Sequence, residues 1–172
     1  MKIVTTPMCE EIVRLAGVTD YAVNKFPDKN DGDFAILLSE SKVEMEALQI
    51  MINTPRQVFD SIKKVSKLAG SELSDNEILE FFEGYDLARK YLNSTFKRDI
   101  NVKVYSEFLK DIVLDVGFGI DDDDFEYVIY PDYLKDKVIE TENLVEIPSH
   151  NSISKNPFEK IELRYSILEN LI

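Results

Sequence analysis

The chain has 172 residues and a formal net charge of −13, with 44% hydrophobic and 31% charged residues. This length is typical of one domain that buries roughly two thirds of its surface, so we expect a single domain over residues 1–172. The acidic charge argues against nucleic acid and anionic membrane surfaces as partners. One cysteine and one histidine exclude an internal disulfide and the usual zinc sites. Because no apolar run could span a membrane and no signal peptide is visible, we expect a cytoplasmic protein.

The first predicted strand and helix place the only cysteine of the chain. Residues 2–5 are predicted to form a buried strand, and a helix follows with Thr6 as its N-cap and Pro7 at its first position. Gly17 supplies the C-terminal stop. Cys9 therefore falls in the first helical turn, at the carboxyl end of a strand, where α/β proteins bind ligands.

Two interpretations of Cys9 remain open. The N–H groups and dipole of a helix start favour thiolate and lower the thiol pKa below its usual value of about 8.5. Thr6 stands at the offset from which its hydroxyl can accept the Cys9 N–H. Against this, a lone cysteine is often a small buried hydrophobe, and the neighbouring Glu10 and Glu11 raise a thiol pKa. We expect an accessible, reactive Cys9, with a packed cysteine as the alternative.

Two short strands are predicted before the second helix, at residues 21–24 and 34–38, separated by the turn-rich run 26–33. The second is a continuous apolar run, as in a central parallel strand. Ser39 and the small polar residues after it would then lie at the same sheet edge as Cys9.

A second strand-Thr-Pro-helix unit follows, with a strand at 47–52 and a helix at 55–69 that begins at Thr54. We expect it to be a neighbour of the first unit in one sheet, with Thr6 and Thr54 at one edge. The Gly-x-Gly-x-x-Gly and Walker-type loops are absent, which excludes the common dinucleotide and P-loop sites. A mononucleotide still suits the two helix starts.

The second half of the chain repeats this alternation. Ser74 and Glu77 form a capping box that opens a helix to about residue 93, whose aromatic face is typical of a core or a homodimer contact. The remaining elements expected are a strand at 102–105, a helix at 106–116, strands at 125–130 and 138–147, and a helix at 156–172. Together they predict an α/β three-layer sandwich, with one mainly parallel sheet of five or six strands and helices on both faces.

Two polar segments of the second half are weak candidates for chemistry. Asp121 to Asp124 are predicted to form a solvated turn, because consecutive carboxylates diverge and cannot converge on one cation. His150 lies in a polar loop and would act as a base only if that loop folded over Cys9.

One cysteine at a helix start suits three functions. Cys9 is a nucleophile that takes an activated acyl group as a thioester, or it is a redox or peroxide-reacting thiol, or it is inert in a non-enzymatic binding or assembly protein. The Thr-x-x-Cys spacing is similar to that of peroxiredoxins. However, Lys2 stands where they have a proline, and the chain has no second cysteine to resolve an oxidised one.

The start Ile3-Val4-Thr5-Thr6-Pro7-Met8-Cys9-Glu10 resembles the thioester-forming protein of iron-guanylylpyridinol (FeGP) cofactor biosynthesis. That cofactor belongs to the [Fe]-hydrogenase of methanogens. The resemblance implies that Cys9 attacks the carboxyl carbon of a guanylylpyridinol-type nucleotide precursor, which a partner enzyme has adenylated. No built-in cofactor and no metal are expected. The candidate nucleotide-binding residues lie at the helix starts and the sheet edge: Thr6, Pro7, Met8, Glu10, Ser39 and Thr54.

Overall fold

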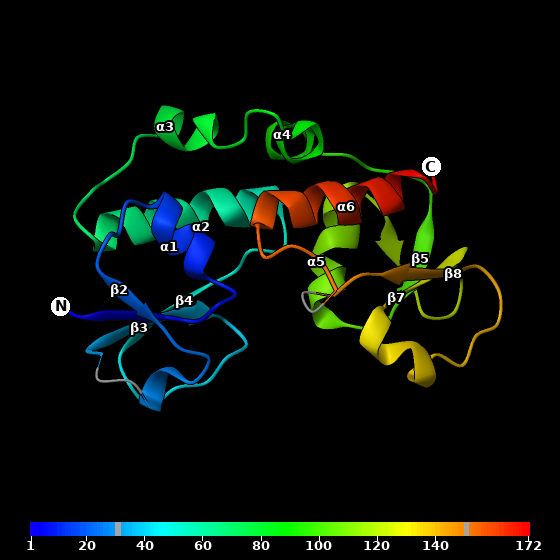
Figure 1. Cartoon of the computed structure of the whole chain (residues 1–172). Coiled ribbons are helices and arrows are strands. Elements are labelled where there is room, and N and C mark those ends of the chain that lie inside the picture. Colours follow the sequence, from blue (N-terminus) through cyan, green and yellow to red (C-terminus); the bar gives the residue numbers. More distant parts are fainter. Residues whose placement is uncertain (30–31, 150–151) are drawn as a thin grey trace. The chain divides into compact units, whose positions relative to one another are not determined.

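The computed structural model describes residues 1–29, 32–149 and 152–172, and it divides the chain into two compact units (Figure 1). Unit 1 comprises Met1–Ile52, Arg56–Glu83 and Lys155–Pro157. Unit 2 comprises Asn53–Pro55, Gly84–Ser154 and Phe158–Ile172. Where we expected a single domain, each unit has a sheet of its own.

Each unit contains a four-stranded sheet in which every strand pair is parallel. Sheet A of unit 1 has the order β2-β1-β3-β4, and sheet B of unit 2 has the order β6-β5-β7-β8. The strands are β1 (Ile3–Thr5), β2 (Tyr21–Val23), β3 (Phe34–Leu38), β4 (Ala47–Ile50), β5 (Asn101–Val104), β6 (Gly119–Ile120), β7 (Tyr127–Pro131) and β8 (Leu144–Ile147). The α/β class is confirmed, but the single sheet of five or six strands is wrong. Apolar patterns locate a strand without fixing its partners, which are set by contacts distant in sequence.

In unit 1 the helices lie on one side of the sheet. Figure 1 shows α1 (Glu10–Leu15) and α2 (Pro55–Leu68) on one side of sheet A, and the short 3-10 helix η1 (Pro27–Lys29) on the other. On sheet A an apolar cluster joins the strands to the β3–β4 connection; it consists of Val4, Ala35 and Leu37 with Ala22, Val43, Met45 and Ala47 packed against them. The prediction of helices on both faces is therefore wrong for this sheet, because connections cover its second face.

Unit 2 contains α4 (Asp86–Asn93), α5 (Glu107–Val116), the 3-10 helix η2 (Asp132–Lys137) and most of α6 (Pro157–Glu169). The helix predicted at 106–116 is confirmed as α5, and Ser106 caps it, since its hydroxyl accepts the Leu109 N–H at 3.3 Å. The strand expected at 138–147 is shorter, because η2 and an irregular segment precede β8. Residues 138–143 form a connection, although their alternating polarity is typical of a strand.

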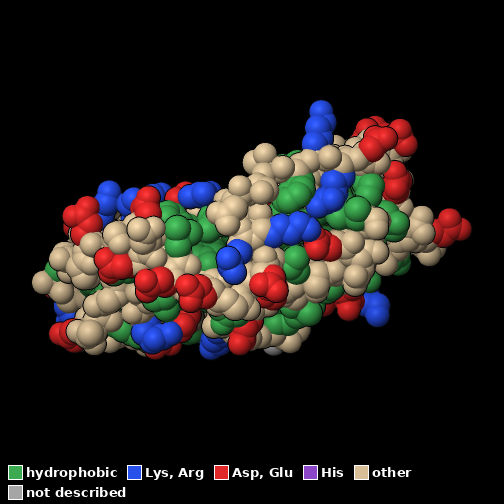
Figure 2. Space-filling view, turned by 90° about the horizontal axis from the view of Figure 1, so that it is seen from above, with side chains coloured by type: hydrophobic (Ala, Val, Ile, Leu, Met, Phe, Trp, Pro, Cys, Tyr) green, Lys and Arg blue, Asp and Glu red, His purple; other side chains and the backbone are tan. Residues whose placement is uncertain are grey.

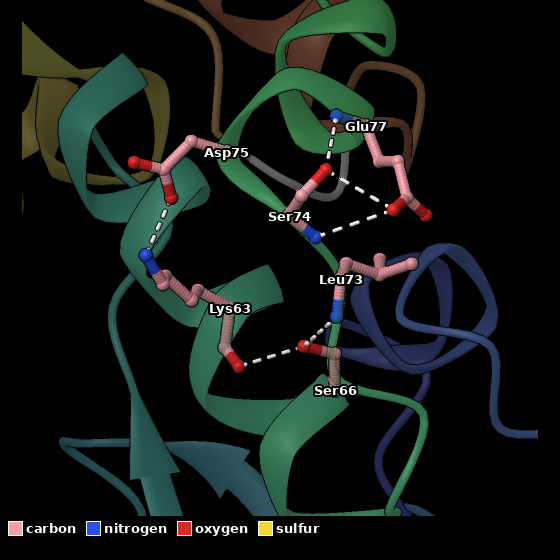
Figure 3. Close-up of polar contacts among 6 residues, drawn as sticks. All are labelled: Lys63, Ser66, Leu73, Ser74, Asp75 and Glu77. Carbon is pink, nitrogen blue, oxygen red and sulfur yellow. Dashed lines mark hydrogen bonds and ion pairs between the residues drawn. The ribbon is translucent and has the colours of Figure 1, made fainter.

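The capping box at Ser74 is confirmed. The Ser74 hydroxyl accepts the Glu77 N–H at 3.2 Å and opens α3 (Asp75–Glu80), while Lys63 pairs with Asp75 (Figure 3). The predicted helix to residue 93 is nevertheless broken between α3 and α4. Gly84 lies in the break with φ +84°, a backbone conformation that a continuous helix does not contain.

The two units follow the same path through the chain. From its first strand on, each unit runs strand, helix and strand, and then two further parallel strands and a helix. In each sheet the first strand of the unit occupies the second position in the strand order. Gly17 follows α1 and Gly117 ends α5, the helices that come after the first strand of each unit, with φ +89° and +103°. The N–H of the next residue, Val18 or Phe118, donates to the carbonyl five residues back. Counting back from these glycines matches Cys9 with Leu109, and both are fully buried. The repeat that the sequence suggested, between 3–17 and 48–70, is not the one the fold displays.

No helix in the described part of the chain is both long and apolar enough to cross a membrane. On the face that Figure 2 shows, acidic and basic side chains are interspersed, with hydrophobic side chains between them.

Candidate functional site

The turn after β1 holds Cys9 differently from the prediction. Residues 7–9 form a turn and α1 begins at Glu10, so Cys9 is the N-cap and Thr6 precedes the helix by a full turn. The Cys9 N–H donates to the Thr6 backbone carbonyl at 3.0 Å. A proline at residue 7 suits such a turn as well as it suits a helix start.

Cys9 is 0% exposed, so the expectation of an accessible thiol is wrong. It shares its helix with the fully buried Ile12 and Val13, and its counterpart in unit 2 is Leu109, which is also fully buried. Leucine at the matching position shows that this site of the fold is filled by a core side chain. Cys9 is therefore packed in the core of unit 1, as the alternative interpretation of this residue expects.

A pocket of about 390 Å³ lies beside Thr6 at the carboxyl end of sheet A. Four segments of unit 1 line it: the residue after β1, the end of β3, the residues around η1, and the β3–β4 connection. The described lining residues are Thr6, Lys25, Phe26, Pro27, Asp28, Lys29, Leu37, Ser41, Lys42 and Val43. The carboxyl edge of a parallel sheet is the usual ligand site of α/β folds, because loops there can vary without disturbing the strands.

The pocket is positively charged in an otherwise acidic chain. Lys25, Lys29 and Lys42 line it together with one carboxylate, that of Asp28. Within residues 1–29, 32–149 and 152–172, none of the three lysines forms an ion pair. The lysine ammonium groups of residues 25 and 29 lie 5.9 and 5.1 Å from the ring centre of Phe26, which is 56% exposed.

Asp28 joins two walls of the pocket. Its carboxylate accepts the backbone N–H groups of Glu44, at 3.1 Å, and of Met45, at 3.2 Å. These bonds tie η1 to the β3–β4 connection across a long stretch of sequence. Because the Asp28 charge is directed to backbone donors, it offsets the lysines only in part.

The other predicted binding residues are dispersed. Pro7 and Met8 are half-buried in the turn, and Glu10 accepts the Tyr21 hydroxyl at 3.3 Å. Ser39 is exposed and continues the strand ladder, with its N–H donating to the Ile50 carbonyl at 2.9 Å. Among the described residues that line the pocket, Thr6 is the one predicted from the sequence.

The strands of the two strand-Thr-Pro-helix units belong to one parallel sheet, as predicted, but Thr54 is not among the described residues that line the pocket beside Thr6. β1 and β4 are parallel members of sheet A, but β3 lies between them, so they are not neighbours. Thr54 itself is buried and belongs to unit 2.

Sequence reasoning missed the lysines and Phe26 of the pocket. Phe26 and Lys29 lie in the turn-rich run 26–33, and Lys25 directly precedes it. No excess of lysine marks this segment in the sequence, because residues 25–33 contain Lys25 and Lys29 together with three aspartates. The segment forms a site only in the folded chain, where Lys42 of the β3–β4 connection lines the same pocket.

The other polar segments supply no comparable site. His150 lies outside the described residues. Asp121 to Asp124 form a turn in which the Asp121 carboxylate accepts the Asp123 and Asp124 N–H groups at 2.9 and 3.0 Å, which lowers the pKa of Asp121. In the described part of the chain, no group of His, Cys, Asp and Glu is arranged to hold a metal ion.

Comparison with known proteins identifies the fold alone. No family model matches the sequence, and no curated protein matches it. Among solved structures, the chain is similar to the crystal structure of the metal-dependent lipoprotein YcdH from Bacillus subtilis. The TM-score is 0.54 at 11% sequence identity, over 99% of this chain and 97% of that one.

Proposed function

We propose that unit 1 binds a small nucleotide-like anion in the pocket beside Thr6, and that the chain is a ligand-binding protein. The observation that carries this proposal is the group of three lysines around one pocket of an acidic chain. Lysine ammonium groups that share a pocket repel one another, and an anion relieves that repulsion. The binding free energy of the anion is greatest when the lysines have no ion-pair partner that the anion must first displace.

The size and lining of the pocket also support a small organic anion. Its volume of about 390 Å³ falls in the usual range of small-molecule pockets, roughly 300–1,000 Å³. Thr6 and Ser41 contribute hydroxyls, while Leu37, Val43 and Phe26 contribute apolar surface. A molecule with one anionic group and one flat apolar group, such as a mononucleotide, matches both kinds of lining.

GMP is the probe for this proposal, because the sequence resemblance implies a guanylyl ligand. By isothermal titration calorimetry at low salt, we expect the full chain to bind GMP at least tenfold more tightly than guanosine, since a charge-assisted contact is worth about 1.5–3 kcal/mol. Affinity should fall with ionic strength, because the lysines are exposed to solvent. Lys42→Gln should weaken GMP binding several-fold.

Lys63→Gln is the matched control, because Lys63 pairs with Asp75 on α3 and does not line the pocket (Figure 3). It should bind GMP as the wild type does. Equal affinities for GMP and guanosine, or an equal loss in both lysine variants, would contradict the proposal.

The thioester role implied by the sequence resemblance is a second candidate. It is favoured by one contact: the Cys9 N–H donates to Thr6, which lines the pocket. Cys9 itself is fully buried, so a covalent role requires the turn at residues 7–9 to open. We propose the ligand-binding role as the first function and the thioester as a step conditional on that opening.

Labelling of the cysteine separates the two candidates. We expect iodoacetamide to modify native Cys9 far more slowly than it modifies the same protein unfolded in urea, because a buried thiol must wait for an opening event. Intact mass spectrometry follows the modification, and Cys9→Ser confirms its position. Rapid labelling of the native chain, with GMP slowing it, would instead favour the thioester role.

A further inference from the structure

Unit 2 contains its own carboxylate near the place that corresponds to the pocket of unit 1. Glu140, in the β7–β8 connection, accepts the Tyr105 hydroxyl at 2.6 Å and pairs with the Lys103 ammonium group at 2.7 Å. The Lys103 and Tyr105 contacts hold the pKa of Glu140 at about 2, so the carboxylate is charged at neutral pH.

The strand registers match these residues with residues of unit 1. Thr5 pairs with Ile36 in sheet A, and Val104 pairs with Ile129 in sheet B. The residue after each strand is therefore Thr6 in unit 1 and Tyr105 in unit 2, and both carry a hydroxyl.

The connections match in the same way when they are counted back from the last strand of each sheet. Leu38 pairs with Ile50, and Pro131 pairs with Ile147, so β4 and β8 are equivalent. Val43 and Glu140 then stand at the same distance before their strands. Val43 lines the pocket beside Thr6, as Glu140 contacts Tyr105.

The difference between the two units is the source of the anion. In unit 2 the chain supplies it as Glu140, whereas in unit 1 the matching residue is the uncharged Val43. The positive charge also has a different source. In unit 2 it is Lys103 of β5, whereas the matching residue of β1 is Val4, and the lysines of the unit 1 pocket come from loops. Unit 1 thus has a hydroxyl and positive charge but no carboxylate at the position that matches Glu140, and the Asp28 carboxylate of the pocket is bonded to backbone N–H groups instead.

We infer that the ligand of unit 1 places its anionic group beside Thr6 and Val43, where unit 2 has Glu140, and lays a flat ring against Phe26. This inference rests on the proposed function and adds the orientation and class of the ligand, a compact oxyanion joined to a ring. Phosphate and carboxylate share the chemistry required at Thr6. The exposed Phe26 ring, with lysines about it, offers the stacking surface that nucleobases use.

Competition titrations test the position of the anion. Inorganic phosphate and acetate are each used to displace GMP from the full chain, and GMP affinity is measured in each variant. Thr6→Val removes the hydroxyl at nearly constant volume, and we expect it to weaken both GMP and the competing oxyanion, GMP by about tenfold. Displacement by phosphate but not by acetate identifies the oxyanion as a phosphate, and the reverse identifies a carboxylate.

Val43→Glu places in unit 1 a carboxylate like that of unit 2, and Val43→Gln is its control of similar size. We expect the glutamate variant to lose GMP and phosphate binding, and the glutamine variant to retain most of it. Both variants are checked for an unchanged cooperative thermal unfolding transition. Phe26→Ala should weaken GMP more than it weakens phosphate, because phosphate has no ring to stack.

The outcomes separate this inference from the proposed function. If the wild type binds GMP but Thr6→Val and Val43→Glu leave phosphate competition unchanged, the orientation is wrong and the ligand-binding role stands. If Phe26→Ala weakens GMP and phosphate equally, the ring does not lie on Phe26. If the wild type binds neither GMP nor phosphate, both proposals are rejected.

Discussion

Replacing Gly117 with alanine is expected to lower the free energy of unfolding by about 2–5 kcal/mol. Gly117 ends α5 with φ +103°, a conformation that costs an L-residue about 1–2 kcal/mol. An added Cβ would also lie 2.6 Å from the Phe96 carbonyl oxygen and 2.8 Å from its carbon. Both atoms are backbone, so the contact is relieved only by moving the chain between α4 and β5. Urea denaturation of the full chain, followed by far-UV circular dichroism, measures the change.

Gly84→Ala is the matched control in the same unit. Gly84 has φ +84°, yet nothing lies within 4 Å of the position that its Cβ would take. We therefore expect it to lose only the conformational cost, about 1–2 kcal/mol. If both variants lose the same amount, the close approach of Phe96 is not the cause, and the strain at Gly117 is conformational alone.

Tyr165→Phe is expected to destabilise unit 2 by about 1–3 kcal/mol at neutral pH. The Tyr165 side chain is fully buried on α6, and its hydroxyl donates to the Asp115 carboxylate at 2.5 Å. The substitution keeps the ring and removes the donor, so it leaves a half-buried carboxylate without this hydrogen bond. Tyr133→Phe is the control, because Tyr133 is 58% exposed, and it should be nearly neutral.

The cost of Tyr165→Phe should depend on pH in a defined direction. Burial raises the pKa of Asp115 above its usual value, and the hydrogen bond from Tyr165 opposes that rise. A carboxyl whose folded-state pKa is raised adds stability at low pH, and that stability is lost as pH rises through the folded-state pKa. Without the Tyr165 hydroxyl the pKa rises further, so the variant should lose more stability between acid and neutral pH than the wild type does.

Thermal melts from pH 3 to pH 7 test this expectation. The destabilisation should be smallest at pH 3, where Asp115 is protonated in both proteins. Adding Asp115→Asn to the Tyr165→Phe chain should remove the extra dependence on pH, because no carboxyl then titrates at that position. A destabilisation that is constant over this range would show that the cost is lost packing rather than a carboxylate without its donor.

Local signals in the sequence predicted most of the elements. The apolar run at 34–38, the Ser74–Glu77 capping box and the glycine at 17 each act through neighbouring residues, so their effect is visible without the fold. The prediction failed where one local sequence pattern is compatible with two backbone structures. A Thr-Pro pair suits both a helix start and a turn, and at Thr6 the turn formed and α1 began at Glu10.

The internal repeat shows the same ambiguity at a larger scale. The sequence suggested a match between 3–17 and 48–70 because both contain Thr-Pro and a closing glycine. The fold matches α1 with α5 instead, through the Ile-Val pairs at 12–13 and 112–113 and through Gly17 and Gly117. These buried pairs set the packing, whereas a Thr-Pro pair sets only the local backbone.

By itself the sequence determined the α/β class, the acidic charge and the single cysteine, because each follows from composition or from the period of the apolar residues. The tertiary structure decided that the strands form two sheets, that Cys9 is buried, and that three lysines from two connections share a pocket with Thr6. Strand partners and the gathering of side chains depend on contacts between distant residues, and no local pattern encodes them. A site assembled from two loops and a strand end therefore becomes visible only when the sheet has formed.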